Sequence, residues 1–313
     1  MTNGEFFLQY DNNNNNRILI FGTAANLDFL QNSPHWFMDG TFRTVPPQFM
    51  QLYTVHGLQR GHNVVGAYAL LRNKEANTYT EMLTQIRALT NNVEPESFMT
   101  DFETGSSTAL GRVYPNVPKK GCFFHLCKNV FKHVQAEGLL DRYLNDENFR
   151  INVKMISAIA FVPTDDVIDA FQELSDHCGD DEQAILDYFE TYYTGEQRRG
   201  RRLRARFPHA MWNVHGRVEN DLPRTNNHLE GWHNRFNAFI SVRHADIWKF
   251  IQALKGYCAL QNHTRTQAMI GADPPRQRLV YRQVNERLQN LVENYNVNDK
   301  INYLRGIAYN LAF

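Results

Sequence analysis

Three acidic residues stand where the surrounding sequence is apolar or neutral. Asp39 interrupts the run HWFMDGTF, Asp101 ends FMTDF, and Glu230 lies in the polar stretch TNNHLEGWHNRFN. Carboxylates held close together repel one another, so they raise their pKa values or bind cations. Mg²⁺ takes oxygen ligands and keeps open positions for water and phosphate. Two such ions roughly 4 Å apart can promote in-line displacement at a phosphodiester, so these acids predict a site for two Mg²⁺ or Mn²⁺ ions.

Each acid also has a purely structural interpretation. Asp39 precedes Gly40 and could mark a turn at a strand end, and Asp101 could cap the helix that follows it. Glu230 could be the third helical residue of a capping-box-like start with Asn227 as the cap. The prediction of a metal site therefore depends on the three acids together, and on the elements that position them.

Residues 35–125 show an ordered series of strand and helix patterns. Runs rich in aromatic residues and valine, separated by turn-prone segments, predict three consecutive antiparallel strands. A helix with apolar residues on one face, a strand, a second helix and a last strand-like run follow. The strands are expected at 35–42, 49–57, 62–71, 96–102 and 119–125, and the first helix at 77–92.

After residue 125 the strand patterns stop. This order is that of an α/β, ribonuclease-H-like core, a mixed sheet with flanking helices, interrupted by an all-α insertion. We expect residues 1–125 to form the first part of the catalytic core, 126–222 the insertion with an Arg-rich segment, and 223–313 a helical part that completes the core. In this fold the first and fourth strands lie side by side and the late helix packs against them, which would bring the three acids together.

The composition limits the class of protein. A chain of 313 residues that is 42% hydrophobic can bury a sizeable core of one or two domains. No apolar run approaches the roughly 20 residues that span a bilayer, so no membrane partner is expected. No secretory signal is visible at the N-terminus, and four cysteines favour a reducing compartment.

Charge is distributed unevenly along the chain. The formal net charge is zero, but residues 191–313 hold 19 lysines and arginines against 9 aspartates and glutamates, a difference of +10. Such asymmetry favours a polyanionic partner, and we expect DNA. An arginine-rich run at 198–206 would bind phosphates without reading sequence; alternatively it is a solvated loop or a nuclear-import signal, and we expect a nuclear location.

Further side chains are expected to contact DNA. Two tryptophans could stack on an unpaired base near a cut site, although aromatic residues at helical spacing more often belong to the core. The expected DNA-binding residues are Arg198, Arg199, Arg201, Arg202, Arg204, Arg206, Arg224, Arg235, Trp212 and Trp232.

The sequence around the acids resembles the Mutator-like (MULE) class of DDE transposases. The matching stretches are HWFMDGTFRTVPPQFMQLYTVHG, FMTDFETG, GCFFHLCKNVF and LPRTNNHLEGWHNRFN, over about residues 34–255. The resemblance implies a ribonuclease-H-like core with a helical insertion between the second and third acids, and makes the acids the metal-binding triad. It also implies a Cys–x–x–His pair after the second acid. The residues expected near the active site are Cys122, His125, Asn227 and His233.

The cysteines could instead suggest zinc. The spacing CFFHLC supplies at most three ligands, Cys122, His125 and Cys127, where a structural zinc site takes four. We expect Cys122 and His125 to form a buried pair beside the catalytic strands, and Cys127 to lie in the core of the following helix.

The resemblance also implies a function. It predicts a two-metal transposase that cleaves and joins DNA at transposon ends, acting as a homo-oligomer of at least two copies because strand transfer usually pairs two ends. Related transposases commonly carry a zinc-binding, DNA-reading domain ahead of the first acid. Fewer than forty residues precede Asp39, without cysteine, so that domain is expected to be lost or replaced by a separate DNA-end-recognition protein. The alternatives are a host-retained, catalytically silent module that binds DNA or protein, and a nuclease without strand transfer.

Overall fold

The computed structural model describes residues 7–240, 245–276 and 278–311. The chain divides into unit 1, Met1–Lys120 with Asn226–Arg276, and unit 2, Gly121–Thr225 with Gln277–Phe313. The predicted C-terminal segment 223–313 is therefore divided between the two units. None of the described helices is long and apolar enough to cross a membrane.

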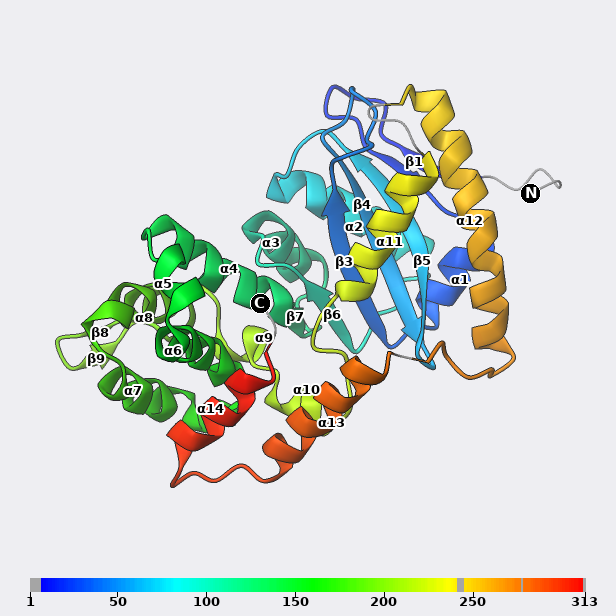
Figure 1. Ribbon diagram of the computed structural model, residues 1–313. Coiled ribbons are helices and arrows are strands. Elements are labelled where there is room, and N and C mark those ends of the chain that lie inside the picture. The colour runs from blue at the N-terminus through cyan, green and yellow to red at the C-terminus, as the bar shows by residue number, and fades with distance from the viewer. Residues whose placement is uncertain (1–6, 241–244, 277, 312–313) are drawn as a thin grey trace. The chain divides into compact units, whose positions relative to one another are not determined.

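A mixed sheet forms the centre of unit 1 (Figure 1). The described strands follow the order β1 (Leu8–Asp11), β2 (Leu19–Phe21), β5 (His62–Leu71), β4 (Gln51–Gln59), β3 (His35–Thr41), β6 (Ser97–Thr100) and β7 (Lys119–Gly121). Strands β3, β4 and β5 pair antiparallel, as the sequence predicts, and β6 pairs parallel to β3. The predicted class, α/β with a mixed sheet and flanking helices, is confirmed at this level.

Helices cover both faces of the sheet in unit 1 (Figure 1). One face packs against α2 (Ala76–Leu89) and α3 (Thr104–Val113), and the other against α11 (Asn227–Ile240) and α12 (Ile247–Met269). Successive side chains of a strand point to opposite faces. Trp36 and Met38 of β3 accordingly lie in the core beneath α2 and α3.

The alternate residues of β3 face α11. The ring of Phe37 contacts that of His228 on α11, with centroids 4.6 Å apart. Asp39 follows Phe37 by two positions and so points to the same side of the sheet. The alternative interpretation of Asp39 as a turn at a strand end is wrong, because β3 continues to Thr41.

Unit 2 is mainly helical. Its described α-helices are α4 (Phe123–Ala136), α5 (Leu140–Asn145), α6 (Glu147–Ala158), α7 (Val167–His177), α8 (Gln183–Phe189), α9 (His209–Trp212), α10 (His215–Glu219), α13 (Leu279–Glu293) and α14 (Lys300–Tyr309). Helix α14 packs against α6, and the Tyr303 hydroxyl donates to the carbonyl of Phe161 at 2.6 Å.

Two segments differ from the sequence prediction. The strand expected at 119–125 ends at Gly121, and α4 begins at Phe123. Its buried residues recur every three or four positions, a helical period that the short run to residue 125 does not reveal. The arginine-rich run, within the segment predicted to be all-α, includes a hairpin of β8 (Gln197–Arg198) and β9 (Arg201–Arg202).

Candidate metal centre

Asp39 lies in β3, and Asp101 follows the last residue of the neighbouring strand β6. The parallel pairing of β3 with β6 joins His35 to Ser97 and Phe37 to Met99, an offset of 62 residues. The same offset relates Asp39 to Asp101, which follows the last residue of β6. Neighbouring strands lie about 4.8 Å apart, so the sheet brings these two acids together.

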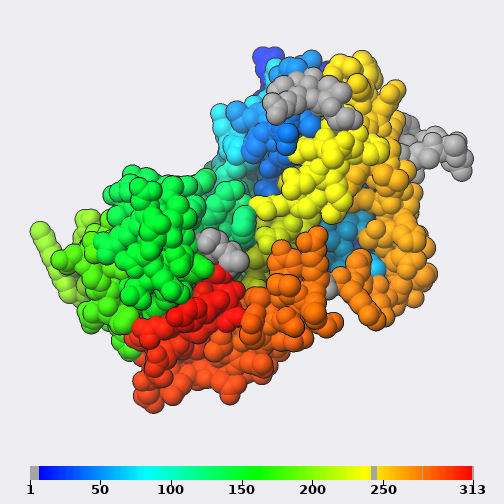
Figure 2. All heavy atoms as spheres, viewed as in Figure 1, coloured from blue at the N-terminus to red at the C-terminus, as the bar shows by residue number. Residues whose placement is uncertain are grey.

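The third acid reaches the same side from α11. Glu230 lies in the first turn of this helix, as predicted, but Asn227 is the first residue of the helix and not its cap, so Glu230 is the fourth helical residue and not the third. His233 follows Glu230 by three positions and therefore shares its helix face. Its Nδ1 lies 3.7 Å from Oδ2 of Asp39. In the space-filling view the early strand segments (blue) remain visible beside α11 (yellow) on this face of unit 1 (Figure 2).

The charges of the acids act on one another. Burial raises the pKa of Asp39 to about 7, and the negative charges of Asp101 and Glu230 add to this effect, while a hydrogen bond from the Gly40 N–H at 2.8 Å opposes it. Burial likewise raises the pKa of Asp101, helped by the charge of Glu103. The charge of Lys74 offsets this effect only in part, and a divalent cation would neutralise the remaining negative charge at this buried site.

The carboxylates point apart in this conformation. Among the residues that the structure describes, no three His, Cys, Asp or Glu side chains are grouped closely enough to hold one metal ion. Oδ1 of Asp39 accepts from Gly40, and Oδ1 of Asp101 accepts from the N–H of Glu103 at 3.2 Å. Asp101 therefore accepts a hydrogen bond from the residue just before α3, and not from a residue in the first turn of that helix. Binding one cation by three acids would require their carboxylates to turn toward one another.

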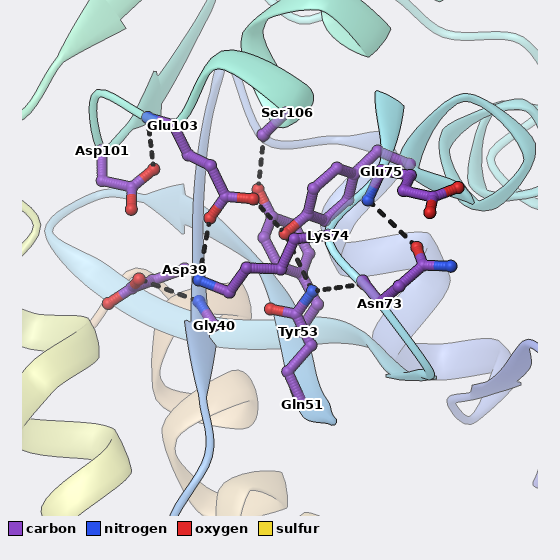
Figure 3. A network of polar contacts seen from close by, with 11 residues as sticks. Asp39, Gly40, Gln51, Tyr53, Asn73, Lys74, Glu75, Asp101, Glu103 and Ser106 are labelled. Atoms are coloured by element: carbon purple, nitrogen blue, oxygen red, sulfur yellow. Dashed lines mark hydrogen bonds and ion pairs between the residues drawn. The ribbon is translucent and has the colours of Figure 1, made fainter. Parts of the chain in front are cut away.

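A polar network surrounds Glu103, whose N–H donates to Asp101 (Figure 3). Glu103 accepts from the Tyr79 hydroxyl at 2.6 Å and lies 3.2 Å from the ammonium of Lys74. Gln51 donates to the same tyrosine oxygen at 2.8 Å. These side chains come from β4, α2 and the loops before α2 and α3, so the network joins the elements around Asp101. Sequence reasoning missed it, because its members share no motif.

Comparison with known families agrees with this geometry. Residues 35–129 match the model of the MULE transposase domain. The match confirms the predicted resemblance for this segment, which contains Asp39 and Asp101 but not Glu230. A comparison with curated protein sequences gives no match.

The Cys–x–x–His pair lies within the MULE segment but in unit 2. Cys122 is the buried N-cap residue of α4. Burial, with the charges of Lys128 and Lys132, lowers the pKa of His125 to about 4, so its imidazole is neutral near pH 7. Cys127 is buried in α4, as predicted. The nearness of Cys122 and His125 to the acids stays a prediction.

The two tryptophans predicted to stack on DNA are core residues. Trp212 is fully buried, and its indole N–H donates to the carbonyl of Tyr193 at 3.1 Å. Trp232 is 2% exposed and stacks on Phe236 with ring centroids 5.1 Å apart. Neither ring is open to a base, so the stacking prediction is wrong for this conformation and the core alternative describes both residues.

The predicted DNA-binding arginines differ in exposure. Arg198, Arg199, Arg201, Arg204 and Arg206 in the arginine-rich run and Arg235 on α11 are exposed. Arg202 is half-buried and contacts Glu190 at 3.2 Å, and the Arg224 guanidinium donates to Asn285 at 2.9 Å. DNA binding stays a prediction for the exposed arginines. The guanidinium groups of Arg202 and Arg224 instead contact residues of unit 2.

Proposed function

We propose that this chain is a divalent-metal-dependent DNA strand-transfer enzyme of the DDE type, with a ribonuclease-H-like core. The observation that supports it best is that Asp39 in β3 and Asp101, just after β6, are related by the same 62-residue offset that pairs these strands, with the charge of Glu230 acting on Asp39. The MULE match over the first two acids points to the same chemistry.

Each residue then has a distinct role. Asp39 and Asp101 would bind two Mg²⁺ or Mn²⁺ ions and Glu230 one of them. Such ions activate an attacking oxygen and stabilise the departing one at a phosphodiester. A first attack by water would nick DNA at an element end, and the freed 3′-hydroxyl would attack a second phosphodiester. The exposed arginines of the arginine-rich run would bind the DNA backbone, in the nucleus and within an oligomer of at least two copies.

The decisive experiment replaces Asp101. Asp101→Asn keeps the side-chain shape but removes the charge, so cleavage of DNA in Mn²⁺ should be lost while DNA binding is retained. Glu96→Gln is the matched control, because Glu96 is an exposed acid just before β6 and lies outside the candidate metal centre. Equal cleavage by wild type and Asp101→Asn would contradict the assignment.

A second candidate is a catalytically silent module that binds DNA or protein. It is favoured by the observation that, within the described ranges, no three acid, histidine or cysteine side chains are grouped to hold a metal. A silent core should show no thermal stabilisation by Mn²⁺, whereas a ligand at a hundred times its Kd stabilises by about 2.7 kcal/mol. A Mn²⁺ titration monitored by melting temperature therefore separates the two candidates.

A further inference from the structure

We propose that Lys74 and Phe42 form a nucleotide subsite at the rim of the candidate metal centre, where Lys74 binds a phosphate of the reacting DNA strand and Phe42 packs against an unpaired base. This inference rests on the proposed function, because it takes the substrate to be DNA. Figure 3 shows the Lys74 side chain extending from its loop toward Glu103. Its ammonium lies 3.2 Å from Oε2 of Glu103 and 4.4 Å from the centroid of the Phe42 ring.

The backbone around Lys74 is held in place. A Cβ atom added to Gly105, in the first turn of α3, would lie 2.5 Å from the Lys74 carbonyl oxygen, so any larger residue there would clash. The preceding residue, Asn73, donates to Asn16 and accepts through its carbonyl from Gln51. Lys74 therefore keeps a fixed position relative to α3 and to Asp101 just before it.

The ammonium has capacity for another anion. A lysine ammonium has three donors, and here Glu103 accepts one while the Phe42 ring covers another direction. The Lys74 side chain is 42% exposed. Its ammonium contacts Glu103, two residues after Asp101, and its charge acts on both Asp39 and Asp101, so a phosphate bound by Lys74 would lie beside the candidate metal centre.

Phe42 offers the apolar half of the subsite. It follows β3, three residues after Asp39, and is 44% exposed. An exposed aromatic ring gives a sequence-tolerant surface for an unpaired base, and cation and ring together are the usual combination for single-stranded nucleic acid. These are the properties that the two buried tryptophans lack.

The test measures binding of a fluorescein-labelled DNA duplex with a single-stranded 3′ end at several salt concentrations. Lys74→Gln should flatten the dependence of log Kd on log salt by about 0.7, the contribution of one phosphate on a single strand, and Lys74→Arg should restore it. Phe42→Ala should weaken binding roughly tenfold, with no change for a blunt duplex. Lys255→Gln is the matched control, since Lys255 also lies over a phenylalanine ring, that of Phe7, in unit 1.

Mn²⁺-dependent stabilisation of the same variants distinguishes the possible failures. The subsite proposal is wrong if Lys74→Gln keeps both its Mn²⁺ stabilisation and the wild-type salt slope. It is also wrong if Lys255→Gln changes the salt slope as much as Lys74→Gln does. If Lys74→Gln loses both stability and its Mn²⁺ response while the salt slope is unchanged, Lys74 has a structural role and the subsite proposal is wrong. Absence of Mn²⁺ stabilisation in the wild type contradicts the proposed enzyme instead, whatever the salt slopes.

Discussion

Oδ2 of Asp39 lies 3.7 Å from Nδ1 of His233. Burial lowers the pKa of His233 to about 4, so near pH 7 the imidazole is neutral and the contact is not an ion pair. Behind it, Nε2 of His233 lies 3.4 Å from the Thr54 hydroxyl, which lies 3.0 Å from Nε2 of His56. These neighbours orient the ring beside Asp39, the proposed metal ligand.

His233→Ala should therefore weaken Mn²⁺ binding. Residues that orient a ligand typically contribute 10- to 100-fold to metal affinity, and we expect a loss of about tenfold. Isothermal titration of Mn²⁺ measures it directly.

His228→Ala is the control for that experiment. His228 lies on the same helix and is half-buried, and burial of its ring lowers its pKa to about 4, so it too is neutral near pH 7; its ring contacts that of Phe37. It should leave the Mn²⁺ affinity unchanged. Equal losses in both variants would mean that the effect comes from the packing of α11.

Asp39→Asn should stabilise the metal-free protein at neutral pH. The pKa of Asp39 is about 7 in the fold against 3.8 ordinarily, so its protonated form stabilises the fold at low pH and this contribution is lost as pH rises through 7. The free energy of unfolding of the variant, relative to wild type, should rise by up to about 4 kcal/mol between pH 4 and pH 7 and then level off. Urea denaturation in EDTA tests this, and a difference that stays constant with pH would contradict it.

Mn²⁺ binding should become stronger as pH rises toward 7. A cation can bind Asp39 only after its proton is lost, so protons and Mn²⁺ compete, and affinity should increase by up to about tenfold per pH unit below the pKa of about 7. The melting temperature at fixed Mn²⁺, measured at several pH values, reports the competition. Asp39→Asn should lose both the Mn²⁺ response and its pH dependence.

The sequence predicts the framework of the site better than its surroundings. The order of strand and helix patterns predicts that the first and fourth expected strands lie side by side, which brings Asp39 and Asp101 together; the register of that pairing comes from the structure. Lys74 and Glu103 carry no such pattern, since their contact depends on how two loops pack against α2 and α3. Trp232 was misjudged because the sequence does not say which face of α11 meets the sheet.

The arginine-rich run should separate into two kinds of residue. Arg204→Gln removes an exposed charge and should flatten the salt dependence of duplex DNA binding by about 0.9. Arg202→Gln removes contacts to Glu190 and to the carbonyl of Gly195, so it should lower the free energy of unfolding by about 1–3 kcal/mol with the salt slope unchanged. Fluorescence anisotropy and urea denaturation of both variants give the comparison.

Trp232 allows core packing to be tested against DNA stacking. Trp232→Ala should cost about 3–5 kcal/mol of unfolding free energy, because the ring packs against Phe236, Tyr68 and Tyr257. Trp232→Phe should cost much less, since within the described part of the chain the indole N–H has no hydrogen-bond partner. The phenylalanine variant should also bind DNA with a single-stranded end as tightly as wild type. A loss of that binding at unchanged stability would mean that Trp232 leaves the core to meet the base, and that the helix carrying Glu230 rearranges on DNA.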